Sequence, residues 1–489
     1  MMPGGSASKV AYIAAGPVLF CLALLLPPAA GMPYTAQYAL AATLWIAFWW
    51  ITEAVPIPVT SLLPIVLFPL GGVLDMERTT AAYGHRMVFL YMGGFIIALA
   101  IERWHLHRRI ALTVIRAIGT DPARIVLGFM LTTFSLSMWI SNTATALMML
   151  PIALAASARQ GSRYADEGSD PPDYYPFAVP LLLGVAYAAS MGGICTLIGT
   201  PTNAIMAAVL RNLFDSDIDF IHWFVFAAPA AVLMLVLGWF YLVNIAFRRS
   251  IRSSAPDLEM LRQEVRDLGP VSVEERRVLA LFALTAAAWM FRGLLLERLA
   301  PRIDDTAIAI TGAVLLFLIP SAEKGSMLMD WKTAMRLPWG ILILFGGGLA
   351  LAEGFMESGL SQWIGLSFQG LQNAPVVLVV LAVAAAVNFM TEITSNVATV
   401  SLLLPILASI APALGLHPYV LMMAATISAS CAFMLPVATP PNAVIFSSGI
   451  IRIRVMARHG FAMNLIAIAI TVALVMALLP RVWGIPVMP

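Results

Sequence analysis

Two short polar motifs in this chain have the residue types needed to bind a small anion together with cations. Ser141-Asn142-Thr143 and Ser395-Asn396 each interrupt a long apolar run, at the point where a new helix is expected to begin. Helix N-termini favour negative charge through unpaired N–H groups and the helix dipole, and hydroxyl and amide side chains add donors. Neither motif contains Lys or Arg. The charge of a bound anion must therefore be balanced by helix dipoles and by co-bound cations.

A second pair of motifs, Thr-Pro-x-Asn-Ala, begins at Thr200 and at Thr439. Thr followed by Pro is typical of an N-cap and the first helical position, so each motif predicts a broken helix that restarts within the membrane. The Asn in the first turn of each restart is placed to buttress the break. Gly192-Gly193 and Gly199 precede the first restart, where we expect them to supply flexible backbone.

Hydroxyl oxygens and free carbonyl oxygens at an unwound turn are hard ligands that suit Na⁺. The spacing predicts two such clusters, one in each half of the chain. For Gly199 and Ala438 the ligand is the backbone carbonyl. The first cluster comprises Ser137, Ser141, Asn142 and Gly199, and the second comprises Thr391, Ser395, Asn396 and Ala438.

The two halves of the chain carry these motifs in the same order. The Ser-Asn motif, a following Leu-Pro-Ile and a preceding Gly-Gly pair recur with a spacing of 254 residues, and the Thr-Pro motif recurs with a spacing of 239. An isolated Ser-Asn-Thr in an apolar run is most often packing between helices. Duplication in register favours a site instead. Repeats with interrupted helices near the bilayer midplane are typical of secondary transporters.

The composition is that of a polytopic membrane protein. Of the 489 residues, 61% are hydrophobic and only 11% are charged, and the mean hydropathy is +0.89. Soluble domains carry about 25% charged residues. The net charge of +2 gives no basic face for nucleic acid, and the three cysteines fit neither a disulfide framework nor a metal motif.

The apolar runs predict about eleven membrane crossings and two re-entrant hairpins, because about 20 apolar residues cross a bilayer. With the N-terminus in the cytoplasm, most basic residues fall inside, as the positive-inside rule requires. The hairpins then open from opposite sides, so the repeats are inverted. The predicted crossings are 10–30, 36–52, 55–74, 87–102, 177–213, 222–247, 278–298, 305–320, 338–356, 418–450 and 461–481, with hairpins at 123–157 and 374–412.

This layout divides the chain into five parts. Residues 1–86 form N-terminal scaffold helices, and 278–337 form scaffold helices of the second half. The first inverted repeat is 87–247, with a hairpin (123–157) and a broken helix (177–213). A cytoplasmic connector, 248–277, follows it. The second repeat is 338–489, with a hairpin (374–412), a broken helix (418–450) and a last helix.

Two features leave more than one interpretation open. Gly93-Gly94 and Gly346-Gly347-Gly348 are expected to serve close helix packing rather than ligand binding. Glu392 is an ionisable residue inside a predicted hairpin, where the first repeat has Met138. Such a residue is a functional candidate. It is either a structural hydrogen-bond anchor or a residue that couples cation and substrate.

At these motifs the chain resembles the divalent anion/sodium symporter family, whose members carry di- and tricarboxylates and sulfate. The resemblance rests on 50–60 (WITEAVPIPVT), on Ser141-Asn142-Thr143, on 391–396 (TEITSN) and on both Thr-Pro motifs. It implies a homodimer in the lipid bilayer, with a static scaffold and a transport region that moves as an elevator. It also implies the Na⁺ clusters above. The implied substrate carboxylate ligands are Ser141, Asn142, Thr143, Thr200, Ser395, Asn396, Thr439 and Pro440.

We therefore expect an all-α integral protein of the cell (inner) membrane that couples Na⁺ to uptake of C4-dicarboxylates such as succinate, malate and fumarate. No covalent chemistry is expected, and an intramembrane enzyme is disfavoured because Glu392 has no His or Asp beside it. A Na⁺-independent exchanger of the same fold stays open. So does a tricarboxylate or sulfate symporter, since Val397 stands where several dicarboxylate members have Thr.

Overall fold

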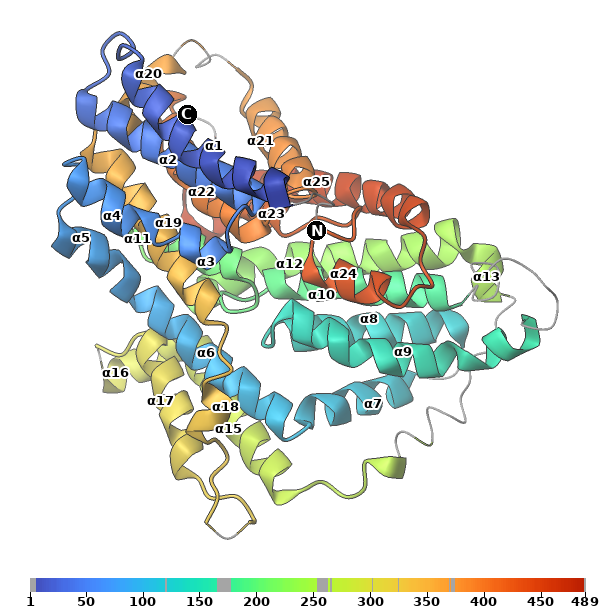
Figure 1. Ribbon diagram of the computed structural model, residues 1–489. Helices are drawn as coiled ribbons and strands as arrows, with labels where there is room; N and C mark the ends of the chain where they lie inside the picture. Colours follow the sequence, from blue (N-terminus) through green and yellow to red (C-terminus); the bar gives the residue numbers. More distant parts are fainter. Residues whose placement is uncertain are drawn as a thin grey trace.

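The computed structural model is built from helices packed around a helical centre (Figure 1). It describes residues 6–118, 121–164, 177–252, 263, 266–300, 302–323, 325–368, 370 and 374–487. Within these ranges the only β pairing is an isolated bridge between Pro320 and Met327. Residues 253–262, 264 and 265 of the predicted connector (248–277) lie outside the described residues, as does most of a polar stretch at 159–175.

The first half of the chain contains the helices before the connector. The N-terminal helices are α1 (Ser6–Leu25), α2 (Tyr34–Thr52), α3 (Ile57–Thr60), α4 (Leu63–Leu70), α5 (Met76–Ala81), η1 (Ala82–Gly84), α6 (Arg86–Arg103) and α7 (Leu106–Ile118). They are followed by α8 (Pro122–Ser137), α9 (Asn142–Tyr164), α10 (Ala178–Ile194), α11 (Pro201–Phe214), α12 (Phe220–Phe240), η2 (Tyr241–Ala246) and α13 (Arg248–Arg252).

The second half repeats this arrangement of hairpins and broken helices. Its first helices are α15 (Val273–Met290), η3 (Arg292–Leu296), α16 (Glu297–Leu299), α17 (Asp305–Leu318), α18 (Trp331–Ala334), α19 (Trp339–Glu357) and α20 (Leu360–Ser367). They are followed by α21 (Val376–Met390), α22 (Asn396–Ala413), α23 (Pro418–Ala429), α24 (Pro440–Phe446) and α25 (Ile453–Trp483).

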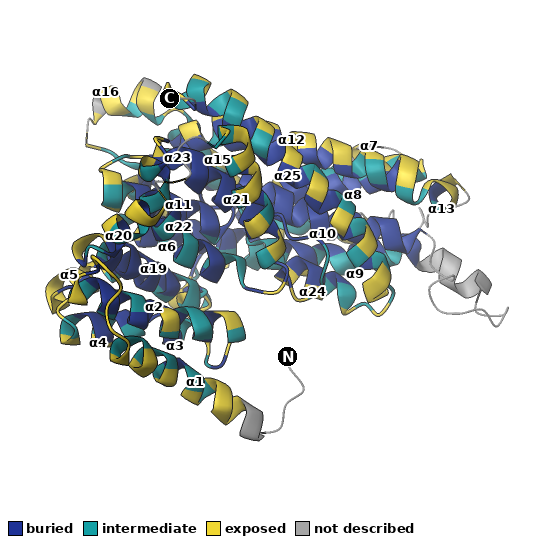
Figure 2. Ribbon diagram, turned by 90° about the horizontal axis from the view of Figure 1, so that it is seen from above, coloured by how far each residue is buried: buried dark blue, intermediate teal, exposed yellow. Residues whose placement is uncertain are grey.

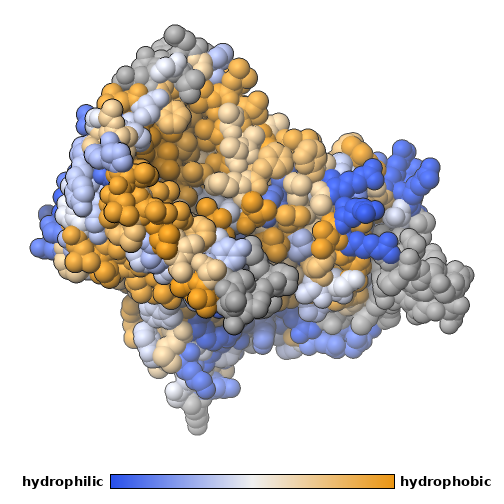
Figure 3. Space-filling view, turned by 45° about the horizontal axis from the view of Figure 1, so that its top comes forward, coloured by the Kyte–Doolittle hydropathy of each residue, from blue (hydrophilic) through white to orange (hydrophobic). Residues whose placement is uncertain are grey.

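Five described segments are long and apolar enough to cross a membrane as single helices. The remaining apolar helices are shorter, with 10–17 residues, and include three of the four legs of the predicted hairpins (in α8, α9 and α21) and the first halves of the broken helices. Figure 3 shows a broad apolar surface with hydrophilic residues gathered toward its edges. The five long segments are Met76–Arg103, Phe220–Ala246, Trp339–Glu357, Asn396–Ala413 and Ile453–Trp483.

The helices at the centre of the molecule are the first halves of the two broken helices. Every residue of α10 and of α23 is buried, and Figure 2 shows both among the darkest ribbons, enclosed by partly exposed helices. Helix α10 packs on both legs of the first hairpin, α8 and α9, and α23 packs on both legs of the second, α21 and α22. Each pair of hairpin legs is thereby held against a rigid inner helix.

Helix α7 was not predicted, because only runs long enough to cross a membrane were sought; the shorter helices α5, α18 and α20 were missed for the same reason. The sequence of α7 is amphipathic: Leu106, Ala111, Leu112 and Ile115 are buried, whereas Arg116 is exposed. That spacing follows the helical period of 3.6 residues. Helix α7 packs on both α6 and α8, and so joins the N-terminal helices to the first hairpin.

Candidate functional site

The turn between α8 and α9 brings the first predicted cluster together. The Ser137 hydroxyl lies 2.7 Å from Asn142 Oδ1 and 2.7 Å from the carbonyl oxygen of Ala189 in α10, so its single proton serves one acceptor at a time. Ser141 Oγ accepts a hydrogen bond from the N–H of Ala144 at 3.2 Å. This is the N-cap geometry expected at the start of a helix. Ser137 and Asn142 therefore meet as predicted.

Glycines hold the first break against this turn by close contact. A Cβ on Gly193 would lie 2.5 Å from Asn142 Oδ1, and a Cβ on Gly199 would lie 2.5 Å from the Gly193 carbonyl oxygen. A Cβ on Gly192 would lie 2.2 Å from the Phe134 carbonyl oxygen. The expectation that Gly192-Gly193 supply flexible backbone is wrong, since both lie within helix α10. They allow the hairpin and the break to approach.

The first break is buttressed by Asn203, as its position in the motif predicted. Its Nδ2 donates toward the carbonyl oxygens of Gly193 (3.1 Å), Ile194 (3.2 Å) and Thr196 (2.7 Å), which the end of α10 leaves without intrahelical partners. Thr200 has the extended backbone of an N-cap, with Pro201 next, but its side chain caps nothing. The Thr196 hydroxyl donates to the Met138 carbonyl and so ties the break to the hairpin turn. Sequence reasoning missed Thr196.

The second break is held by a carboxylate. Glu392, in the turn between α21 and α22, accepts hydrogen bonds from the backbone N–H groups of Phe433, Met434 and Leu435 at 2.9 to 3.2 Å. Asn464 of α25 adds a bond from Nδ2 to Oε1 at 2.7 Å. Of the two interpretations of Glu392, the contacts favour the structural anchor. Asn464 was not singled out, because a lone Asn in an apolar span carries no repeat signal.

The remaining residues of the second cluster lie around this anchor. Thr391 Oγ1 donates to the Asn388 carbonyl at 3.0 Å, and Ala438 is 4% exposed. Asn396 Oδ1 is buried and has no hydrogen-bond partner in the structure. A buried amide oxygen without a donor is costly, and it is suited to a cation. Among the four residues predicted for the second cluster, Asn396 thus offers an unpartnered buried oxygen to a cation.

The two breaks lie beside each other. Thr202 Oγ1, in the first turn of α11, is 2.8 Å from Ser430 Oγ, which follows α23. Helix α11 also packs on α22, and α24 packs on α9, so each break contacts the hairpin of the other half. Thr439 caps α24 by accepting from the Asn442 N–H at 3.3 Å. The four helix starts therefore surround one region at the centre of the molecule.

This region is partly open. Ser141, Asn142, Thr143, Ser395 and Asn396 are half-buried, Thr200 and Thr439 are buried, and Pro440 is exposed. Two apolar neighbours, Ile393 and Val437, are each 70% exposed. Donor groups on the hairpin turns can therefore reach a molecule that enters beside them.

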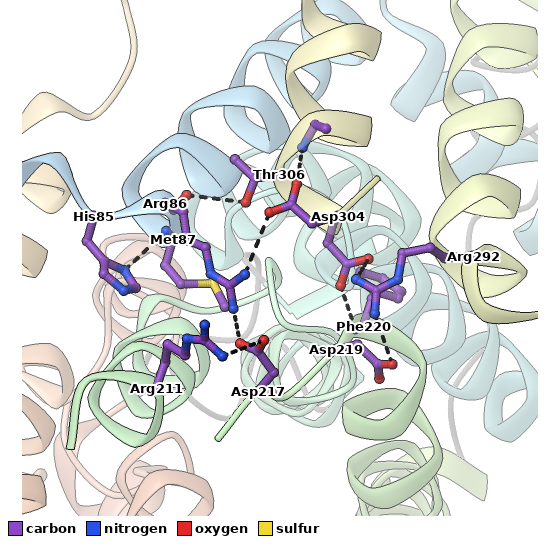
Figure 4. Close-up of polar contacts among 12 residues, drawn as sticks. His85, Arg86, Met87, Arg211, Asp217, Asp219, Phe220, Arg292, Asp304 and Thr306 are labelled. Carbon is purple, nitrogen blue, oxygen red and sulfur yellow. Dashed lines mark hydrogen bonds and ion pairs between the residues drawn. The ribbon is translucent and has the colours of Figure 1, made fainter. Parts of the chain in front are cut away.

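Charged side chains gather elsewhere, at one end of the helices (Figure 4). Arg86 of α6 pairs with Asp217 and Asp304, and Arg211 of α11 pairs with Asp217 at 2.9 Å. In a second group, Arg292 lies 3.3 Å from Asp219 and 3.1 Å from Asp305. Asp305 Oδ2 also accepts from the Phe220 N–H at 2.8 Å. These contacts join α11 and α12 to α6, η3 and α17.

Comparison with known proteins places this arrangement in a family. The model of the sodium:sulfate symporter transmembrane region matches residues 7–488. The sodium-dependent dicarboxylate transporter SdcS of Staphylococcus saprophyticus is 43% identical over 476 residues, which cover 96% of this chain and 92% of that protein. SdcS of Staphylococcus aureus is 43% identical over 486 residues, covering 99% and 93%.

Two solved transporters share the fold at low sequence identity. The YdaH transporter of Alcanivorax borkumensis superimposes with a TM-score of 0.60 at 15% identity, covering 94% of this chain and all (100%) of that one. MtrF of Neisseria gonorrhoeae gives 0.58 at 12% identity, covering 95% and 97%. With an all-helical transporter fold and a family match over nearly its whole length, the chain belongs to the sodium:sulfate symporter family, the divalent anion/sodium symporters.

Proposed function

We propose that this protein is a secondary transporter that couples Na⁺ to the uptake of C4-dicarboxylates such as succinate, malate and fumarate. The observation that carries the proposal is the pair of Asn residues, Asn142 and Asn396, each at the first position of a helix that begins at a hairpin turn. Relatives 43% identical are sodium-dependent dicarboxylate transporters, which supports both the ion and the substrate class.

The substrate lies between the two hairpin turns. One carboxylate is met by the hydroxyl, amide and backbone donors of the first turn, and the other by those of the second, with Thr200, Thr439 and Pro440 at the breaks. Two Na⁺ ions complete the site. One is held by Ser137, Ser141, Asn142 and the Gly199 carbonyl, and the other by Thr391, Ser395, Asn396 and the Ala438 carbonyl. Because ions and substrate share ligands, each raises the affinity of the other.

Transport proceeds by alternating access. The hairpins and broken helices form a transport region that moves as an elevator against a scaffold, which includes the helices of 1–86 and 278–337. The protein works as a homodimer in the cell inner membrane, with its N-terminus in the cytoplasm and about eleven crossings. The contacts of α11 and α12 with α6, η3 and α17 support a boundary between two such regions.

The test is uptake of labelled succinate into proteoliposomes. An inward Na⁺ gradient is compared with equal gradients of K⁺ and choline, and unlabelled malate, citrate and sulfate are tested as competitors. We expect uptake that requires Na⁺ and is competed by malate at lower concentration than by citrate or sulfate. Uptake that ignores Na⁺ but rises when succinate is preloaded inside would identify an exchanger and overturn the coupling.

The substrate preference turns on Val397. It lies in the first turn of α22, half-buried, at the position that corresponds to Thr143 in the first half. The valine removes one hydroxyl from the second turn and adds apolar bulk beside the substrate, so the choice among dicarboxylate, tricarboxylate and sulfate has to be tested by competition. Stronger competition by citrate or sulfate than by malate would contradict the dicarboxylate assignment while leaving Na⁺ coupling in place.

A further inference from the structure

A buried tyrosine of α6 reaches from the neighbouring helices into the first break. Tyr91 is 1% exposed. Its ring meets Phe95 edge-on at a centroid distance of 5.3 Å, and it meets Phe345 of α19 in a tilted contact at 5.0 Å. Aromatic contacts of this kind hold a ring in one orientation. The phenol hydroxyl is therefore aimed in a fixed direction.

That direction is the unwound segment between α10 and α11. The Tyr91 hydroxyl lies 2.6 Å from the Leu197 carbonyl oxygen and also contacts the Thr200 carbonyl oxygen. The hydroxyl has one proton, so it donates to one of the two carbonyls at a time. The two acceptors bracket Gly199 along the chain. No other phenol among the described residues donates a hydrogen bond to this segment.

The unwound segment needs such a partner because its carbonyls lack a regular helical ladder. Asn203 holds the Thr196 carbonyl, and Tyr91 holds those of Leu197 and Thr200. These bonds fix the peptide planes that follow Leu197 and Thr200, which lie just beyond the two peptides that contain Gly199. A carbonyl that serves as a cation ligand must be held close to its binding geometry, since loosely positioned ligands bind weakly.

We infer that Tyr91 is a positioning residue for the first Na⁺ site: it orients the peptides around Gly199 so that the Gly199 carbonyl faces the cation. Tyr91 does not itself touch the ion or the substrate. The inference rests on the proposed function, and it extends the cation site to a helix that carries none of its ligands.

The test compares Tyr91→Phe with Tyr83→Phe. Tyr83 is a matched control, because its hydroxyl donates to the Ser61 carbonyl, away from both breaks. For each protein, initial succinate uptake is measured against Na⁺ concentration at saturating succinate, which separates half-saturation from maximal rate. A second readout is the stabilisation of the detergent-solubilised protein by Na⁺ against thermal unfolding.

We expect Tyr91→Phe to raise the half-saturating Na⁺ concentration about fivefold, as the loss of one hydrogen bond implies. The maximal rate should stay within about a factor of two. Tyr83→Phe should leave the Na⁺ dependence unchanged. If the Tyr91→Phe protein is not expressed in folded form, Phe345→Leu is used instead. It weakens the aromatic contact that orients the Tyr91 ring but keeps the hydroxyl, so we expect a smaller increase in the half-saturating Na⁺ concentration.

Three results bear against the inference. An unshifted Na⁺ dependence in Tyr91→Phe, or in Phe345→Leu where that variant replaces it, overturns the inference alone. Equal shifts in Tyr91→Phe and Tyr83→Phe show a general loss of packing and also overturn it. Uptake by the unmodified protein that is indifferent to Na⁺ overturns the proposed function, and the inference with it.

Discussion

Asn464 Nδ2 donates to Glu392 Oε1 at 2.7 Å in the buried interior, between the last helix and the second hairpin turn. The same carboxylate accepts from three successive backbone N–H groups, Phe433 to Leu435. One side chain thus joins the hairpin turn, the break and α25. The Phe433 N–H also donates to Asn464 Oδ1 at 3.1 Å, but without Glu392 the N–H groups of Met434 and Leu435 would lose their acceptor, which is costly.

The first half makes the corresponding link without a charge. Met138 stands 254 residues before Glu392, and Thr196 stands 239 residues before Leu435. The Thr196 hydroxyl donates to the Met138 carbonyl. Both halves therefore tie hairpin turn to break at equivalent positions, one through a backbone carbonyl and the other through a carboxylate. The stronger, charge-assisted link lies in the second half.

Replacing Glu392 with Gln should destabilise the protein strongly. The amide retains the shape, but its NH₂ group would face N–H donors, so we expect a loss of about 2–4 kcal/mol. Thermal unfolding can be followed with a thiol-reactive fluorophore, because Cys195 and Cys431 are buried. The exposed Cys21 is first replaced by Ser.

The matched control for this variant is Glu353→Gln. Glu353 pairs with Arg78, whose side chain is 43% exposed, and exposed pairs contribute about 0–1 kcal/mol. If Glu392→Gln melts at the same temperature as the unmodified protein but loses Na⁺ dependence, the residue is a coupling group and not an anchor.

Asn142→Ala and Asn396→Ala should each reduce uptake more than tenfold, because each removes an amide that is shared by substrate and cation. Both side chains are half-buried at the start of a helix, so the fold should persist. Uptake in proteoliposomes measures the loss of transport, and the elution volume on gel filtration shows whether the fold persists. Asn244→Ala, at an exposed position of η2, is the control. Full uptake by either site variant would remove that Asn from the site.

Gly193→Ala should impair the first Na⁺ cluster without replacing any of its ligands. The new Cβ would lie 2.5 Å from Asn142 Oδ1, a distance that real contacts do not show, so the amide must move. We expect a higher half-saturating Na⁺ concentration for uptake. Gly94→Ala is the control, since its Cβ would meet Ile198 at an ordinary 3.5 Å. Equal Na⁺ dependence in both variants would contradict the placement of Asn142 against Gly193.

The positions of the helix starts could be predicted from the sequence because they depend on local chemistry. Asn142, Pro201, Asn396 and Pro440 each begin a helix where the motifs placed one. Proline and small polar residues favour a helix start through the backbone of their own turn. A single motif of this kind could equally reflect helix packing, but its duplication in both halves favoured a functional site.

The tertiary contacts of the site could not be predicted in this way. The bond between Thr202 and Ser430 joins residues 228 positions apart, and Tyr91 meets the break across 106 to 109 positions. No motif or repeat in the sequence indicates that either pair is in contact. The role of Gly192-Gly193 was predicted wrongly for the same reason. From the sequence alone, a glycine that allows a neighbouring segment to approach closely cannot be distinguished from one that makes the backbone flexible.

Arg292 provides a prediction at the other end of the molecule. Its side chain is 17% exposed and pairs with Asp219 and Asp305, and Asp305 in turn accepts from the Phe220 N–H (Figure 4). Arg292→Gln would leave two partly buried carboxylates close together without their cation. We expect a loss of about 1–3 kcal/mol in the free energy of unfolding, measured as a lower melting temperature.

Arg78→Gln is the control for this variant, because Arg78 also pairs with more than one carboxylate, Glu353 and Glu357, but is 43% exposed. Water screens that group, so its loss should contribute at most about 1 kcal/mol.

Arg292 has a third partner, Glu297 at 3.1 Å, but that side chain is 44% exposed and its pair should add little. We therefore expect burial of Asp219 and Asp305 to account for most of the difference between the two variants. Since Arg292 joins η3 to the start of α12, the lower melting temperature should be partly restored by Asp219→Asn, which removes one of the two stranded charges. A melting temperature of Arg292→Gln equal to that of Arg78→Gln would show that the buried group adds no stability across this boundary.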